Sequence, residues 1–106
     1  MLHASMGMVT EAIEFMETVV ENILGGKPID VVNVMEEIGD QNWYQAIPMN
    51  LYGLTPEQCM VANIAKLLAR YPDKFSLEKA VNRDLDAERA VLESHSGHDH
   101  LDAKEN

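Results

Sequence analysis

The fold of this chain is decided by residues 2–24, which read LHASMGMVTEAIEFMETVVENIL. Seven apolar residues recur in this stretch at alternating steps of four and three, which is the spacing of an amphipathic helix. Further apolar residues widen the hydrophobic sector to about half of the helix circumference. One neighbouring helix cannot cover so wide a sector, so the pattern predicts an all-α bundle completed by a homo-oligomer, either a homodimer or a homotetramer. The seven residues are Leu2, Met6, Val9, Ile13, Met16, Val20 and Ile23.

A second helix is predicted after a short loop at Gly25–Pro28. Asp30 is its expected N-cap, because a short acidic side chain can accept hydrogen bonds from the free backbone amides of the first turn. The helix reaches at least Ala46. Pro48 is expected to end or kink it, because proline has no backbone N–H, and the chain is then expected to turn at Gly53.

The C-terminal half carries the remaining helical segments. Thr55 and Gln58 read as the N-cap and the capping-box partner of a third helix, which is expected to stop at Tyr71 before a proline. A further helical stretch opens at Ser76, with residues 82–84 as a candidate interruption that fixes the C-terminal segment. The expected architecture is therefore a bundle of four to five helices.

Length and composition predict one domain over residues 1–93. Residues 94–106 are mostly Ser, Gly, His, Asp, Lys and Glu, a composition that cannot bury enough apolar surface to become ordered. This segment is expected to be a disordered tail, and its three histidines are interpreted as solvated.

The charge of the chain limits its partners. Eighteen acidic residues against eight basic ones give a formal net charge of −10, which argues against nucleic-acid binding by phosphate neutralisation. No signal peptide and no apolar stretch of about 18 residues is visible, so a cytoplasmic protein without a membrane partner is expected. A phosphate ligand would need a cation between its oxygens and the protein carboxylates.

Two pairs of acids are placed as such a cation site requires. Glu11 and Glu14 lie three residues apart in the first helix, and Glu37 and Asp40 lie three apart in the second, so each pair occupies one helix face. The pairs are nearly equidistant from the loop, so an antiparallel hairpin would bring them opposite each other. Oxygen ligands of this kind favour Mg²⁺, with Mn²⁺ as a possible substitute. The alternative is that these acids only form the solvated faces of two helices.

On these motifs the chain resembles the MazG-like group of all-α nucleoside triphosphate pyrophosphohydrolases, whose mark is ExxE followed after a spacer by ExxD. The resemblance covers residues 2 to about 93, and the order and spacing of the motifs make it specific. The matching stretches are EAIE at 11–14, EEIGDQNWY at 36–44, NIAK at 63–66, RYP at 70–72 and NRD at 82–84.

The resemblance implies hydrolysis of an NTP or dNTP to the monophosphate and pyrophosphate, as part of nucleotide-pool house-cleaning. It implies that Mg²⁺ is bound by Glu11, Glu14, Glu37 and Asp40. It also implies that Lys66, a candidate catalytic residue, and Asn63 contact phosphate or sugar. Tyr44 is expected near the nucleotide, and Arg70 either contacts the ligand or pairs with a carboxylate.

The general base is left open between Glu14 and Glu36, because either could accept a proton from the attacking water if it is not fully engaged by metal. Two alternatives to the NTP hydrolase also stay open. One is a non-catalytic helical module that binds a metal or a basic partner, and the other is hydrolysis of phosphoribosyl-ATP by the same fold.

Overall fold

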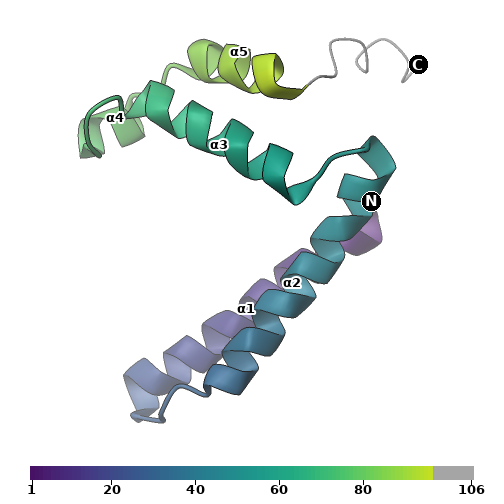
Figure 1. Ribbon diagram of the computed structural model, residues 1–106. Coiled ribbons are helices and arrows are strands. Elements are labelled where there is room, and N and C mark those ends of the chain that lie inside the picture. Colours follow the sequence, from purple (N-terminus) through teal and green to yellow (C-terminus); the bar gives the residue numbers. More distant parts are fainter. Residues whose placement is uncertain (97–106) are drawn as a thin grey trace. The chain divides into compact units, whose positions relative to one another are not determined.

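The computed structural model describes residues 1–96, and every regular element in this part of the chain is an α-helix. The predicted all-α class is thereby confirmed. The chain forms two compact units, Met1–Leu54 and Thr55–Asn106, whose helices are drawn in Figure 1. Within residues 1–96, no helix combines the length and the apolar character that crossing a membrane requires. One domain over residues 1–93, the MazG-like identity and the oligomer stay predictions.

The first unit is a hairpin of two helices, α1 (Leu2–Gly25) and α2 (Val31–Tyr52), which run antiparallel and side by side (Figure 1). Helix α1 ends at Gly25 and is capped by Gly26, whose φ of 65° is a left-handed conformation that glycine adopts without strain. The Asp30 side chain caps α2 by accepting hydrogen bonds from two backbone amides of the first turn. The predicted loop and N-cap are confirmed.

Helix α2 continues through Pro48 and ends at Tyr52. Pro48 was expected to end or kink the helix, and the first of these two alternatives is wrong. Proline withholds only its own N–H, and the residues after it can still donate hydrogen bonds within the helix. Gly53, with a φ of 64°, is the C-cap of the helix, and the backbone N–H of the next residue, Leu54, donates to the carbonyl of Met49 over 2.8 Å, so the predicted turn is confirmed.

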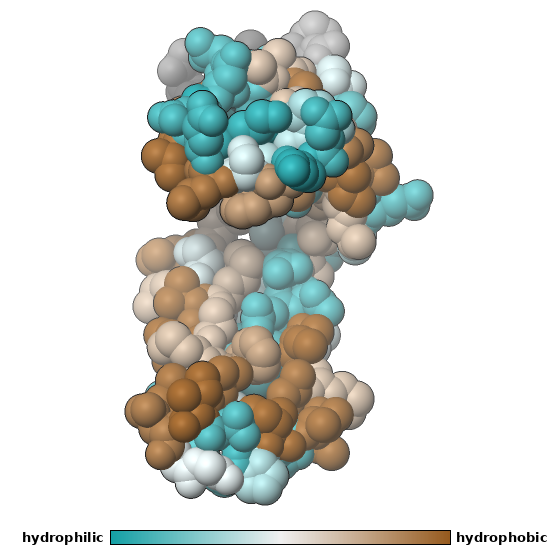
Figure 2. Space-filling model, turned by 90° about the vertical axis from the view of Figure 1, so that its left-hand side faces the viewer, coloured by the Kyte–Doolittle hydropathy of each residue, from teal (hydrophilic) through white to brown (hydrophobic). Residues whose placement is uncertain are grey.

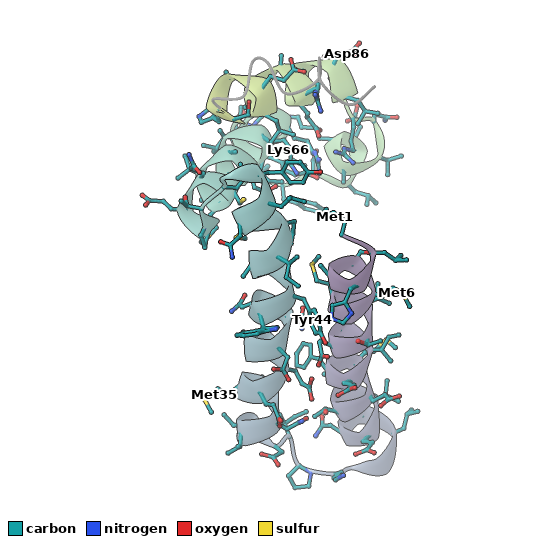
Figure 3. The ribbon with its side chains drawn as sticks, turned by 90° about the vertical axis from the view of Figure 1, so that its right-hand side faces the viewer. Met1, Met6, Met35, Tyr44, Lys66 and Asp86 are labelled. Atoms are coloured by element: carbon teal, nitrogen blue, oxygen red, sulfur yellow. The ribbon has the colours of Figure 1, made fainter. Side chains whose placement is uncertain are left out.

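Helix α1 meets α2 through its small and acidic side. Ala4 is 1 % exposed, Gly7 is buried and Glu11 is half-buried. The seven apolar residues that define the helix period are instead 42–73 % exposed, and we call this set the apolar seam. Figure 2 shows hydrophobic side chains gathered over the hairpin, and Figure 3 shows Met6 pointing away from α2. Among the described residues, Ala4 is the only hydrophobic side chain that is fully buried.

The second unit contains α3 (Pro56–Arg70), α4 (Leu77–Val81) and α5 (Leu85–Ser96). The predicted capping box of α3 is present, since the Thr55 hydroxyl accepts from the backbone of Gln58 while the Gln58 side chain accepts from the backbone N–H of Thr55. Ser76 caps α4, and the break between α4 and α5 falls at the expected residues 82–84.

A buried acid holds α3 and α5 together. Glu88 is 4 % exposed and accepts two hydrogen bonds from Arg70, at 2.7 and 2.8 Å, and two more from Arg83. These guanidinium groups hold the pKa of Glu88 well below its ordinary value. The Asp84 carboxylate accepts from the backbone N–H of Ala87. Arg83 and Asp84 therefore contact the C-terminal helix through their side chains.

Helix α5 ends at Ser96, so its last three residues lie in the segment that was expected to be disordered. The Ser94 hydroxyl donates to the carbonyl of Val91, and Nδ1 of His95 lies 2.9 Å from the same oxygen. The rest of the predicted tail, including His98 and His100, lies outside the described residues.

Candidate metal centre

Two contacts fix the register of the hairpin. Tyr44 of α2 lies against Gly7 of α1, so closely that a Cβ atom on Gly7 would fall 2.3 Å from two carbons of the ring. Towards the loop, the Thr18 hydroxyl donates to Oδ1 of Asn33 over 2.7 Å. The same spacing, eleven residues, separates Gly7 from Thr18 and Asn33 from Tyr44. The register of the two helices is therefore the same at both contacts, and the two acid pairs lie across from each other between them.

Three of the four predicted metal ligands come together. One carboxylate oxygen from each of Glu11, Glu37 and Asp40 lies within 4.8 Å of the others, and we call these residues the acid cluster. Two oxygens on opposite sides of a Mg²⁺ ion are about 4.2 Å apart, so small side-chain movements would let all three share one ion. Helices α1 and α2 contain no lysine or arginine that could neutralise the cluster instead.

One oxygen of the buried Glu37 carboxylate lacks a hydrogen-bond partner among the described residues. The Glu37 side chain is buried, with 4 % of its surface exposed. The Asn33 amide donates to Glu37 Oε1 over 2.9 Å, whereas Oε2 has no hydrogen-bond partner among the described residues. A buried carboxylate oxygen without a partner is costly, because it loses its hydration and gains nothing in return. A cation beside Oε2 would meet that requirement, so the donor set fits a hard metal ion.

The surroundings of Glu11 raise the pKa of its carboxyl group. Partial burial removes water from its carboxylate, and the negative charges of Glu14, Asp40 and Glu37 add repulsion, so its pKa lies above the ordinary value of 4.5. A divalent cation would reverse this effect, since it favours the ionised carboxylate.

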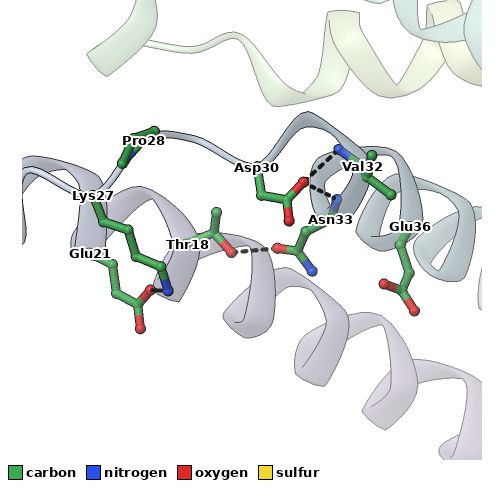
Figure 4. Close-up of a pocket in the computed structure, with 8 residues that line it drawn as sticks. All are labelled: Thr18, Glu21, Lys27, Pro28, Asp30, Val32, Asn33 and Glu36. Atoms are coloured by element: carbon green, nitrogen blue, oxygen red, sulfur yellow. Dashed lines mark hydrogen bonds and ion pairs between the residues drawn. The ribbon is translucent and has the colours of Figure 1, made fainter.

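The fourth predicted ligand, Glu14, is exposed and stays outside the acid cluster. It borders a groove of about 290 Å³ that also includes Glu37. Glu36, the other candidate base, is exposed and borders a different pocket of about 400 Å³ near the loop, shown in Figure 4. Glu14 therefore shares a groove with a member of the cluster.

Tyr44 lies one turn beyond Asp40, in the space between α1 and α2 that Figure 3 shows. Its ring packs on Gly7 and meets the ring of His3 edge-on, with 5.6 Å between ring centroids. Tyr44 therefore packs the hairpin together beside the acid cluster. Contact of Tyr44 with a nucleotide stays a prediction.

The remaining predicted substrate residues lie in the second unit, on α3. Asn63 is exposed and Lys66 is half-buried. Arg70 makes the structural ion pair with Glu88 and also lies over the ring of Tyr71, with 5.5 Å from its Cζ atom to the ring centroid. Arg70 thus takes one of its two expected roles, and contact of these three residues with substrate stays a prediction.

Sequence reasoning missed two polar residues of the hairpin, Thr18 and Asn33. Asn33 precedes Glu37 by one helical turn, a spacing at which an amide and a carboxylate can bond, so this contact had a signal in the sequence. The contact between Thr18 and Asn33 joins two helices and had none.

A scan against protein-family models, a search of curated proteins and a search of solved structures each found no match to this chain.

Proposed function

We propose that this protein is a magnesium-dependent nucleoside triphosphate pyrophosphohydrolase of the MazG-like kind. The observation that carries the proposal is the buried, unpartnered Oε2 of Glu37 within the acid cluster. An acid pair that only solubilised its helix would face water, whereas Glu37 is turned into the hairpin beside Glu11. The ExxE and ExxD motifs supply the assignment to a reaction.

Glu11, Glu37 and Asp40 would hold the cation, with Glu14 beside them. Bound Mg²⁺ would supply the positive charge that neutralises the phosphate oxygens and activates water. Asp40 is exposed, so the cluster opens to solvent on its side and a triphosphate can approach there. Water attacks the α-phosphorus and the bond from that phosphorus to the bridging oxygen breaks, which releases pyrophosphate and leaves a nucleoside monophosphate.

Glu14 is the preferred general base of the two candidates. Its carboxylate is exposed, lies close enough to raise the pKa of Glu11 and is not a member of the cluster, so it is free to accept the proton of the attacking water. Lys66 would place a positive charge on the phosphates or the leaving group, as the family resemblance implies. Asn63 is proposed to contact phosphate or sugar and Tyr44 to lie near the nucleotide, as the resemblance implies, while Arg70 pairs with Glu88.

The apolar seam supports a homo-oligomer, either a homodimer or a homotetramer. Its residues include Leu2 at 73 % and Ile23 at 71 % exposed, and they form a continuous stripe along α1. A contiguous apolar stripe of this kind is typical of a protein interface. The charges of α1 lie mainly on other faces, so a second copy can pack on the stripe without facing a row of like charges.

The test is release of pyrophosphate from a panel of NTPs, dNTPs and phosphoribosyl-ATP with Mg²⁺, comparing the native chain with Glu37→Gln. Glutamine keeps the shape and removes the charge, so pyrophosphate release is expected to fall at least about 100-fold while helix content is retained. Glu57→Gln, which removes an exposed acid of the second unit, is the matched control and is expected to be fully active.

Three other results would redirect the assignment. Turnover of phosphoribosyl-ATP alone would change the substrate and keep the reaction. Metal binding without any turnover would favour the non-catalytic module. Equal activity of Glu37→Gln and the native chain would remove the acid cluster from the mechanism.

A further inference from the structure

A chain of side-chain contacts leads from α1 to the buried acid of the cluster. The Thr18 hydroxyl and Oδ1 of Asn33 are 2.7 Å apart, and Nδ2 of Asn33 lies 2.9 Å from Oε1 of Glu37. All three side chains are half-buried or buried. Neither Thr18 nor Asn33 belongs to the motifs that carry the proposed reaction.

The chemistry of the three groups allows only one direction for these hydrogen bonds. An ionised carboxylate can only accept, so the Asn33 amide must turn its NH₂ group towards Glu37. Its carbonyl oxygen then faces Thr18, whose hydroxyl must donate. Flipping the amide would set two oxygens against each other at Glu37. The Glu37 carboxylate therefore sets the orientation of the Asn33 amide, and the Thr18 hydroxyl, by donating to the carbonyl end, holds the amide in place.

The backbone under Asn33 is also fixed. Asp30, the N-cap of α2, accepts hydrogen bonds from the backbone N–H of Val32 at 2.9 Å and of Asn33 at 3.3 Å, as Figure 4 shows together with the Thr18 contact. The Asn33 backbone is thus fixed by the N-cap of α2, and its side-chain amide is held by Thr18 of α1. It has little freedom to rotate away from Glu37.

We propose that Thr18 and Asn33 are positioning residues that hold Glu37 by Oε1 and so leave Oε2 to bind the cation. This inference rests on the metal centre of the proposed function. A carboxylate with both oxygens free can rotate about its last bond and present either one, whereas a carboxylate bonded at one oxygen presents the other in a fixed direction. Partners of this kind orient ligands and strengthen metal binding.

The experiment measures the dissociation constant of Mn²⁺ by calorimetry and counts bound Mn²⁺ by electron paramagnetic resonance, without nucleotide. Thr18→Val keeps the side-chain shape and removes the donor. Thr18→Ser keeps the donor, and Asn33→Leu removes both bonds. Thr10→Val is the matched control, because the Thr10 hydroxyl lies on the same helix and bonds only the backbone carbonyl of Gly7.

We expect Thr18→Val to weaken Mn²⁺ binding about 10-fold and Asn33→Leu about 10- to 100-fold, with helix content unchanged. Thr18→Ser and Thr10→Val should bind as the native chain does. Since Thr18→Ser and Thr18→Val differ in the donor group, a loss confined to valine is not explained by general damage to the hairpin.

Native affinity in Thr18→Val, or equal losses in the serine and valine variants, would overturn the proposal. A native chain that binds no Mn²⁺ would overturn it together with the metal centre. A native chain that binds Mn²⁺ but hydrolyses no nucleotide would refute the proposed hydrolase alone, and the order of affinities would still decide the role of Thr18 and Asn33.

Discussion

Replacing Gly7 with alanine should push the two helices of the hairpin apart. The new Cβ atom would lie 2.3 Å from Cδ1 and Cε1 of Tyr44 and 2.6 Å from Cγ, whereas ordinary contact begins at 3.4 Å. The ring or the helix must therefore retreat by the difference, 3.4 − 2.3 = 1.1 Å. The clash involves three atoms of one rigid ring, so no rotation of a flexible side-chain end can relieve it.

The expected magnitude follows from two opposing contributions. Overpacking of this kind costs about 1–3 kcal/mol, while alanine in place of glycine stabilises a helix interior by about 1 kcal/mol. The net effect should be a loss of up to about 2 kcal/mol in the free energy of unfolding, and each kcal/mol lost lowers Tm by roughly 4–8 °C. Because Gly7 lies one turn from Glu11, the affinity for Mn²⁺ should fall as well.

The assay is urea unfolding followed by circular dichroism at one fixed protein concentration. Gly39→Ala is the control, since nothing lies within 4 Å of a Cβ built on this second helical glycine, and it should stabilise the protein by about 1 kcal/mol. In a Tyr44→Ala background, Gly7→Ala should also become stabilising, which isolates the contact as a double-mutant cycle. Stabilisation by Gly7→Ala in the native background would refute the close approach of the helices.

Three further predictions concern charge and assembly. Because the pKa of Glu11 is raised, the folded state binds more protons than the unfolded state above pH 4.5, so the stability of the metal-free protein should fall as the pH rises from there; thermal melts with and without Mg²⁺ should differ in this slope. Because the pKa of Glu88 is lowered, its ion pairs should stabilise the protein above pH 4.5 and lose that effect as the pH falls, and an acid titration of Glu88→Gln should lack this loss. Replacing Ile13 in the apolar seam with glutamate should shift the mass measured by light scattering towards the monomer, and a mass equal to that of the native chain would argue against the seam as an interface.

The sequence by itself determined the helices and most of their ends. The alternating steps of four and three specify α1, and the capping residues Asp30, Thr55 and Ser76 start the later helices where they were predicted. Such signals act between residues one turn apart, so they can be read without knowing the fold. The same local logic predicted that two acid pairs equally far from the loop would face each other.

The tertiary structure alone decided which side of α1 meets α2. The apolar side is the wider one, yet the helices approach through Ala4 and Gly7, whose small side chains admit the ring of Tyr44. The tertiary structure also decided that Glu37 is buried, while Glu14, another of the four predicted metal ligands, stays exposed. The apolar periodicity of a sequence identifies the faces of a helix, but it does not identify the neighbouring element that covers each face.

The same reason explains the role of Arg70 and the course of α2. The sequence left Arg70 open between contact with the ligand and a pair with a carboxylate, and its guanidinium meets Glu88, eighteen residues away on another helix. Pro48 weakens the helix locally, and α2 nevertheless continues to Tyr52. Burial and partner choice depend on contacts between segments distant in the chain, and these contacts exist only once the helices have packed.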